Sequence, residues 1–133
     1  MRRGLVSAAV VSLLVLGVGP AGARMPTVQP IMDVRNAGRC TGGDSTYSLA
    51  VSRYDRNRLR VRFRIAHSTP GQTWQIFGSD DGERIFAVKR DVSSDGTASV
   101  RRRIPDRHGK DKVKVAASNS TSGEACNATV KSF

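Results

Sequence analysis

Histidine, cysteine and aromatic residues are scarce in this chain: of its 133 residues, two are histidine, two are cysteine and 5% are aromatic. His67 and His108 belong to no serine or cysteine nucleophile motif, so a small hydrolase that uses either histidine is the least favoured reading. No Cys-x-x-Cys spacing is present, which argues against a metal site built on cysteine. The sequence therefore predicts a protein that is not an enzyme, with no cofactor and no metal site.

Long hydrophobic runs are absent after residue 23, and no later stretch repeats apolar residues every 3.6 positions. Without that period an α-helical fold is not expected, and without a second apolar run no membrane anchor is expected.

Acidic residues are also few, 11 against 22 lysines and arginines. Asp80, Asp81 and Glu83 lie close together, but Asp-Gly indicates a hairpin tip and the spacing of a calcium loop is missing.

The first 23 residues have the pattern of a secretory signal peptide. Arg2 and Arg3 precede an apolar run from Leu5 to Val18, and a small-x-small cleavage site follows at residues 21–23. We therefore expect a secreted, extracellular protein that begins near residue 24. Residues 24–36 are expected to form a flexible leader, and residues 37–133 a single domain that is a monomer.

Cys40 and Cys126 stand near the two ends of that domain. In an exported protein an even number of cysteines favours a disulfide, and two cysteines allow only one intramolecular pairing. A bridge across so long a segment is expected to stabilise the fold by about 4–5 kcal/mol. Two free thiols or a metal pair are the alternatives.

Apolar and polar residues alternate in segment after segment, which is the pattern of half-buried β-strands. Seven strands are expected, over residues 45–53, 58–67, 72–79, 83–90, 97–104, 111–118 and 124–131. Their number and spacing predict an all-β, seven-stranded antiparallel two-sheet sandwich, immunoglobulin- or fibronectin-III-like in architecture and closed by one disulfide. A small barrel is the alternative.

The usual order of such a sandwich places the strands at 45–53, 58–67 and 97–104 in one sheet and the other four in the second. The shared core is expected to contain Leu49, Val51, Val61, Phe63, Ile65, Trp74, Ile76, Val100, Val113 and Val115. Two points stay open. In the strand at 83–90, either Ile85 with Ala87 or Phe86 with Val88 faces inward. Strict alternation points Arg102 inward, so this residue needs either a bulge or a position at the rim of the sandwich.

Arginine is the commoner basic residue, and the formal net charge is +11. Such a charge favours acidic partners: nucleic acid, anionic wall polymers or lipid head groups. Side chains two residues apart on one strand share a face at intervals of about 6.6 Å. The candidate polyanion-binding residues are therefore Arg58, Arg60, Arg62 and Arg64 on one strand, with Arg101 and Arg103 beside them. An ordinary solvated sheet face is the alternative.

Four segments are similar to those of a group of small secreted actinobacterial proteins with two cysteines and no assigned function. They are residues 38–41 (GRCT), residues 71–74 (GQTW), the loop with Asp106, Gly109 and Asp111, and residues 122–126 (SGEAC). The resemblance covers most of residues 24–133. It implies a fold framed by turns and a disulfide, and it implies no activity and no functional residues.

These observations together predict a secreted, non-enzymatic binding or structural module whose basic face takes anionic polymers such as cell wall or nucleic acid. An extracellular protein is the other partner we expect. The alternative function is a secreted inhibitor of a protease or other hydrolase, which would present a rigid loop at residues 105–110 or 68–72.

Overall fold

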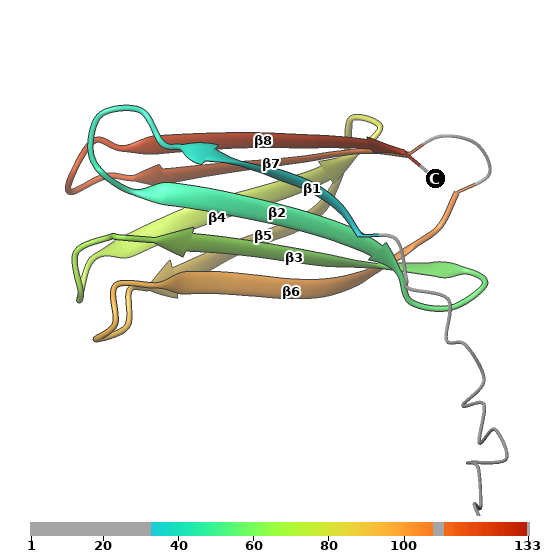
Figure 1. Ribbon diagram of the computed structural model, residues 1–133, viewed down its shortest axis with the longest axis horizontal. Coiled ribbons are helices and arrows are strands. Elements are labelled where there is room, and N and C mark those ends of the chain that lie inside the picture. Colours follow the sequence, from blue (N-terminus) through green and yellow to red (C-terminus); the bar gives the residue numbers. More distant parts are fainter. Residues whose placement is uncertain (1–32, 108–110, 133) are drawn as a thin grey trace, which may run out of the picture.

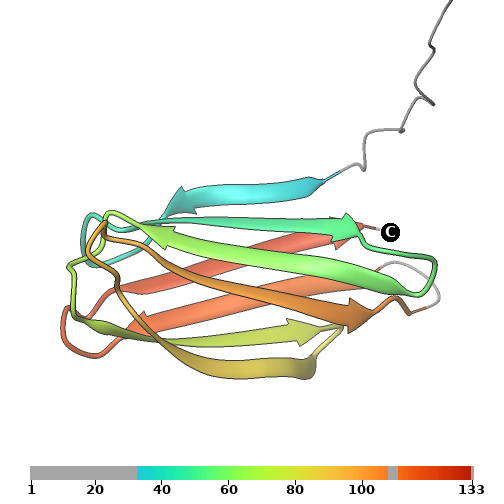
Figure 2. The same cartoon turned by 90° about the horizontal axis from the view of Figure 1, so that it is seen from below.

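The computed structural model describes residues 33–107 and 111–132, and these form eight β-strands and no helix. The strands are β1 (Val34–Arg39), β2 (Thr46–Arg53), β3 (Arg58–Ala66), β4 (Thr73–Asp80), β5 (Glu83–Asp91), β6 (Ala98–Pro105), β7 (Asp111–Asn119) and β8 (Ala125–Ser132). They make two antiparallel four-stranded sheets, ordered β1-β2-β3-β6 and β5-β4-β7-β8. The sheets lie face to face as two layers (Figures 1 and 2).

The predicted division of the strands between the two sheets is confirmed, but the predicted number of strands is wrong. The sequence indicated seven, and the additional strand is β1, which pairs with β2 from Val34↔Val51 to Arg39↔Thr46. Its first three residues fall within the range 24–36 that the sequence indicated as a leader. Within the described residues, regular structure therefore begins at Val34. The signal peptide at 1–23 and the start of the leader lie outside the described residues.

The ten residues expected in the core are all buried, and they belong to one hydrophobic cluster between the sheets. Trp74 lies on β4, has no exposed surface and donates its indole N–H to the Ser68 hydroxyl at 2.9 Å. Burial of a ring of this size with its polar atom satisfied stabilises both sheets at once.

The part of the chain that the structure describes contains no helix with the length and hydrophobicity that a membrane crossing needs.

Strand β5 faces the core through Phe86, which is buried, and Val88, which is partly buried. A bulge fixes this phase, because Gly78 pairs with Phe86 whereas Ser79 pairs with Arg84, and Ile85 is left as the extra residue. A Cβ on Gly78 would lie 2.2 Å from the Phe86 ring. Glycine therefore lets the ring pack directly on the β4 backbone.

Arg102 keeps its inward phase without a bulge, since the pairing of β3 with β6 runs unbroken through Val61↔Arg102. Strand β6 is at the edge of its sheet, and Arg102 is only partly buried. Its guanidinium donates to the Arg101 carbonyl at 3.1 Å. The rim position therefore accounts for this residue, because the stem packs while the charge stays near water.

The predicted disulfide is confirmed: Cys40 and Cys126 are bonded, with their Cα atoms 4.4 Å apart. Cys40 directly follows β1 and Cys126 lies in β8, so the bridge joins the two sheets. Beside it Thr41 and Ala125 exchange backbone hydrogen bonds of 2.8 and 3.0 Å. The disulfide and this pair fasten one end of the sandwich.

Candidate functional site

The outer face of the β1-β2-β3-β6 sheet carries a group of seven arginines, which we call the arginine face: Arg35, Arg58, Arg60, Arg62, Arg64, Arg101 and Arg103. The strand register brings them together. Arg60 stands directly opposite Arg103, and Arg62 directly opposite Arg101. The structure thus places the six candidate arginines on one surface and adds Arg35, which the sequence did not indicate.

Carboxylates neutralise only part of the arginine face. Asp33 binds Arg35 at 3.1 Å and Arg62 at 2.9 Å, and Asp55 binds Arg58 at 2.7 Å. The Arg58 hydrogen bond is the main reason that the pKa of Asp55 is lowered. Among the described residues, no acidic side chain forms an ion pair with the remaining four arginines, which are Arg60, Arg64, Arg101 and Arg103.

Tyr54 lies at one end of the arginine face, although the sequence indicated no aromatic residue there. The guanidinium carbons of Arg58, Arg60 and Arg103 lie 5.1, 4.9 and 4.2 Å from the centre of its ring. A ring contacted by three guanidiniums attracts each of them through its quadrupole and holds their stems in place. Tyr54 follows β2 along the chain and meets the face only because the β2–β3 turn folds it back.

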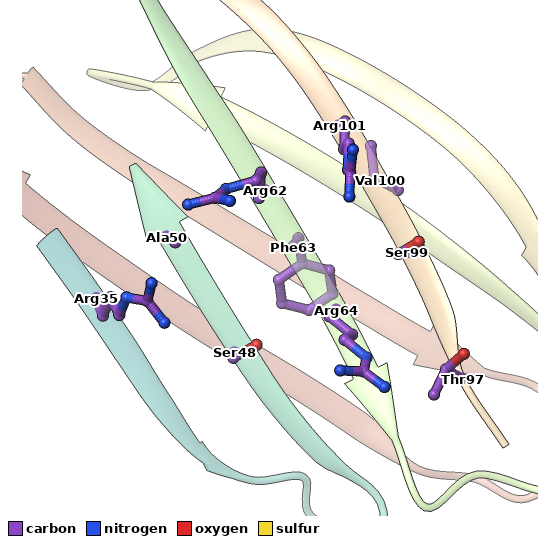
Figure 3. Close-up of a pocket in the computed structure, with 10 residues that line it drawn as sticks. All are labelled: Arg35, Ser48, Ala50, Arg62, Phe63, Arg64, Thr97, Ser99, Val100 and Arg101. Atoms are coloured by element: carbon purple, nitrogen blue, oxygen red, sulfur yellow. The ribbon is translucent and has the colours of Figure 1, made fainter. Parts of the chain in front are cut away.

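The middle of the arginine face is hollowed into an open depression of about 430 Å³. Figure 3 shows Arg35, Arg62, Arg64 and Arg101 around it, with the small side chains of Ser48 and Ala50 between them. Small residues on β2 leave room beside the long arginines of β3. The result is a shallow basic trough rather than a closed pocket.

The other chemically notable group lies at the opposite end of the molecule from the disulfide, where carboxylates of Asp80, Asp81 and Asp111 gather with their oxygens within 4.8 Å of one another. Burial, together with the neighbouring Asp106 and Asp80, raises the pKa of Asp111 to about 7. In the sequence Asp80 and Asp81 lie beside Glu83, and nothing there indicates that Asp111 joins them. Only the pairing of β4 with β7 brings Asp111 to the hairpin.

Of the two histidines, His67 is exposed in the turn after β3, and His108 lies outside the described residues. The prediction that the protein is not an enzyme stays a prediction.

No protein-family model matches the chain, and neither the curated proteins nor the solved structures contain a match.

Proposed function

We propose that this is a secreted, non-enzymatic module of the two-cysteine group described above, and that its arginine face binds anionic polymers such as cell-wall polymer or nucleic acid. The fold in this proposal is a fibronectin-III-like sandwich to which β1 adds an edge strand. The observation that carries the function is the pairing of arginine with arginine across β3 and β6, at Arg60↔Arg103 and Arg62↔Arg101.

Like charges directly opposite each other on neighbouring strands are destabilising. A surface that is only hydrated gains nothing from this concentration of arginines. Acidic residues in the described part of the chain form ion pairs with only three of the seven arginines. A guanidinium also presents its donors as a planar fork that fits phosphate or carboxylate groups. A polyanion lying along the face would relieve the repulsion and satisfy those donors together.

Binding should be strongly dependent on salt and independent of base sequence. Release of counterions from four to six contacts gives a slope of log K against log salt of roughly −3 to −5. The measurement is fluorescence anisotropy of labelled single-stranded DNA, with heparin and purified anionic wall polymer as competitors.

The variant Arg64→Ser with Arg101→Ser removes two arginines that have no acidic partner, so its slope should be shallower by about 1.5. Its melting temperature should be unchanged or slightly higher, because exposed charges contribute little to folding and Arg62 no longer faces Arg101. The matched control, Lys89→Ser with Lys114→Ser, removes the same charge from the outer face of the other sheet. Equal loss of binding in both variants, or no binding of any polymer at low salt, would contradict the proposal.

The inhibitor alternative has one observation in its favour, the fixed shape of the turn at residues 68–72. Ser68 N–H donates to the Gly96 carbonyl and Gly71 N–H to the Val92 carbonyl, each at 3.0 Å. Thr69, Pro70 and Gly71 are exposed at its tip. Tight inhibition of a secreted hydrolase that is lost on substituting Thr69 or Pro70, and retained in the Arg64/Arg101 variant, would favour this function instead.

A further inference from the structure

Three aspartates converge at the end of the sandwich that holds the β4–β5 hairpin. Asp80 is the last residue of β4, Asp81 is in the hairpin turn and Asp111 is the first residue of β7. One oxygen from each lies within 4.8 Å of the others. Figure 1 shows this hairpin at the end of the molecule where β7 begins.

Two of these carboxylates are buried and have oxygens that accept no hydrogen bond from the described residues. Asp80 and Asp111 are each 1% exposed. No donor within the described residues reaches either carboxylate oxygen of Asp111, or Oδ1 of Asp80. A buried carboxylate is normally paired, hydrogen-bonded or bound to a metal ion, because the loss of hydration is otherwise uncompensated. These oxygens can therefore accept a positively charged ligand.

The third carboxylate is held over the other two by the backbone. Asp81 Oδ1 accepts the Lys112 N–H at 3.1 Å, and Asp81 N–H donates to the Lys112 carbonyl at 3.0 Å. The φ angles of Asp81 and Gly82 are 50° and 86°, which are the signs required by a tight type I′ hairpin. The position of Asp81 beside β7 is thus fixed by the fold.

The arginines near this group form their ion pairs with other carboxylates, although Arg107 lies close enough that, after its hydrogen bond with Glu83, the charges of Asp80 and Asp81 also raise its pKa. Arg107 forms an ion pair with Glu83, and Arg53 lies 3.8 Å from Asp106. Asp106 itself adds negative charge near Asp111. The three clustered carboxylates therefore have no ion pair of their own among the described residues.

We propose that Asp80, Asp81 and Asp111 bind one Ca²⁺ ion, which ties the β4–β5 hairpin to the start of β7. Oxygen ligands lie at about 2.3–2.6 Å from Ca²⁺, so two on opposite sides are about 4.6–5.2 Å apart, which accommodates the observed spread. Mg²⁺ requires ligands at about 2.0–2.1 Å and therefore a tighter group. Water completes the coordination on the exposed side of Asp81. The site is independent of the arginine face.

The test is calorimetric titration of the purified, EDTA-treated protein with CaCl₂ and separately with MgCl₂, together with melting curves. We expect one Ca²⁺ per chain with a Kd of about 10⁻⁴–10⁻³ M, as for sites with few protein ligands, and weaker binding of Mg²⁺. The melting temperature should rise with CaCl₂, because the ion binds the folded state.

Asp81→Asn is the decisive variant, since Asn-Gly is a preferred hairpin turn and the fold is preserved. It should weaken Ca²⁺ binding at least tenfold, and Asp111→Asn should abolish it. Asp44→Asn, which removes an exposed aspartate in the β1–β2 turn, is the control and should bind like the wild type. No heat and no melting shift up to about 10 mM CaCl₂, or wild-type binding by the Asp81 and Asp111 variants, would overturn the proposal.

Discussion

At the scale of single residues, Glu124 shows how one buried charge can fasten a turn. It is 7% exposed, and its Oε2 accepts the backbone N–H of Ser45 at 2.9 Å, linking the β7–β8 turn to the start of β2. Burial alone would raise the pKa of Glu124, but hydrogen bonding from Ser45 and Ser122 outweighs it and keeps the pKa below the ordinary 4.5.

A group whose folded pKa is lowered adds stability that is complete above its unfolded pKa and is lost as pH falls through the folded value. We predict that Glu124→Gln lowers the free energy of unfolding by about 1–2 kcal/mol at pH 7. Below about pH 3 the variant and the wild type should converge. Urea unfolding at several pH values measures this, with Asp44→Asn as the control; a difference that does not change with pH would show that the charge is not responsible.

Trp74 is the residue on which the two sheets depend most. Trp74→Ala should cost about 3–5 kcal/mol, because it opens a large cavity and leaves the Ser68 hydroxyl without its donor. Trp74→Phe keeps most of the volume and loses only the indole N–H, so it should cost clearly less. Urea unfolding followed by circular dichroism separates the two, and equal losses would show that the hydrogen bond, rather than packing, dominates.

At the scale of strands, alternation was enough to predict seven of eight elements. Strand β3 shows why: its inward residues are large and apolar while its outward residues are arginines, so period two is unmistakable. Strand β1 has no such pattern. Its inward positions are Val34, Asn36 and Gly38, and a Cβ on Gly38 would lie 2.8 Å from the Tyr47 hydroxyl. Backbone pairing with β2 and the hydrogen bond from the Asn36 side chain to the Thr129 carbonyl hold β1 in place. The periodicity of the sequence indicates neither of these interactions.

The same difference between local geometry and long-range contacts decides how far each candidate site could be predicted from the sequence. The arginines of β3 belong to one strand, so their shared face follows from local geometry. The positions of Tyr54 and Asp33 on that face, and of Asp111 beside the hairpin, depend on turns and on contacts between segments far apart in the chain. The phase of β5 likewise depended on a bulge opposite Gly78 that apolar alternation does not reveal.

At the scale of the whole molecule, the two ends of the sandwich differ in the groups that they carry. The disulfide and the Thr41–Ala125 pair hold one end, where β1 meets β8. The aspartate cluster lies at the other end, near the β4–β5 hairpin (Figure 1). Strands of eight or nine residues separate them by roughly 25 Å, so changes at one end should not alter the other.

Replacing both cysteines, Cys40→Ala with Cys126→Ala, should lower the free energy of unfolding by about 4–5 kcal/mol, since the bridge closes a long loop in the unfolded chain. The sheets should persist, because each has its own hydrogen-bonded ladder and the core residues other than the two cysteines are unchanged. Urea unfolding with circular dichroism measures both, and reduced wild-type protein should match the variant. A variant as stable as the oxidised wild type would refute the entropic role of the bridge.

If the two ends act independently, CaCl₂ should still raise the melting temperature of the cysteine-free protein by the wild-type amount. Loss of that response would show that the disulfide holds the distant aspartates in place.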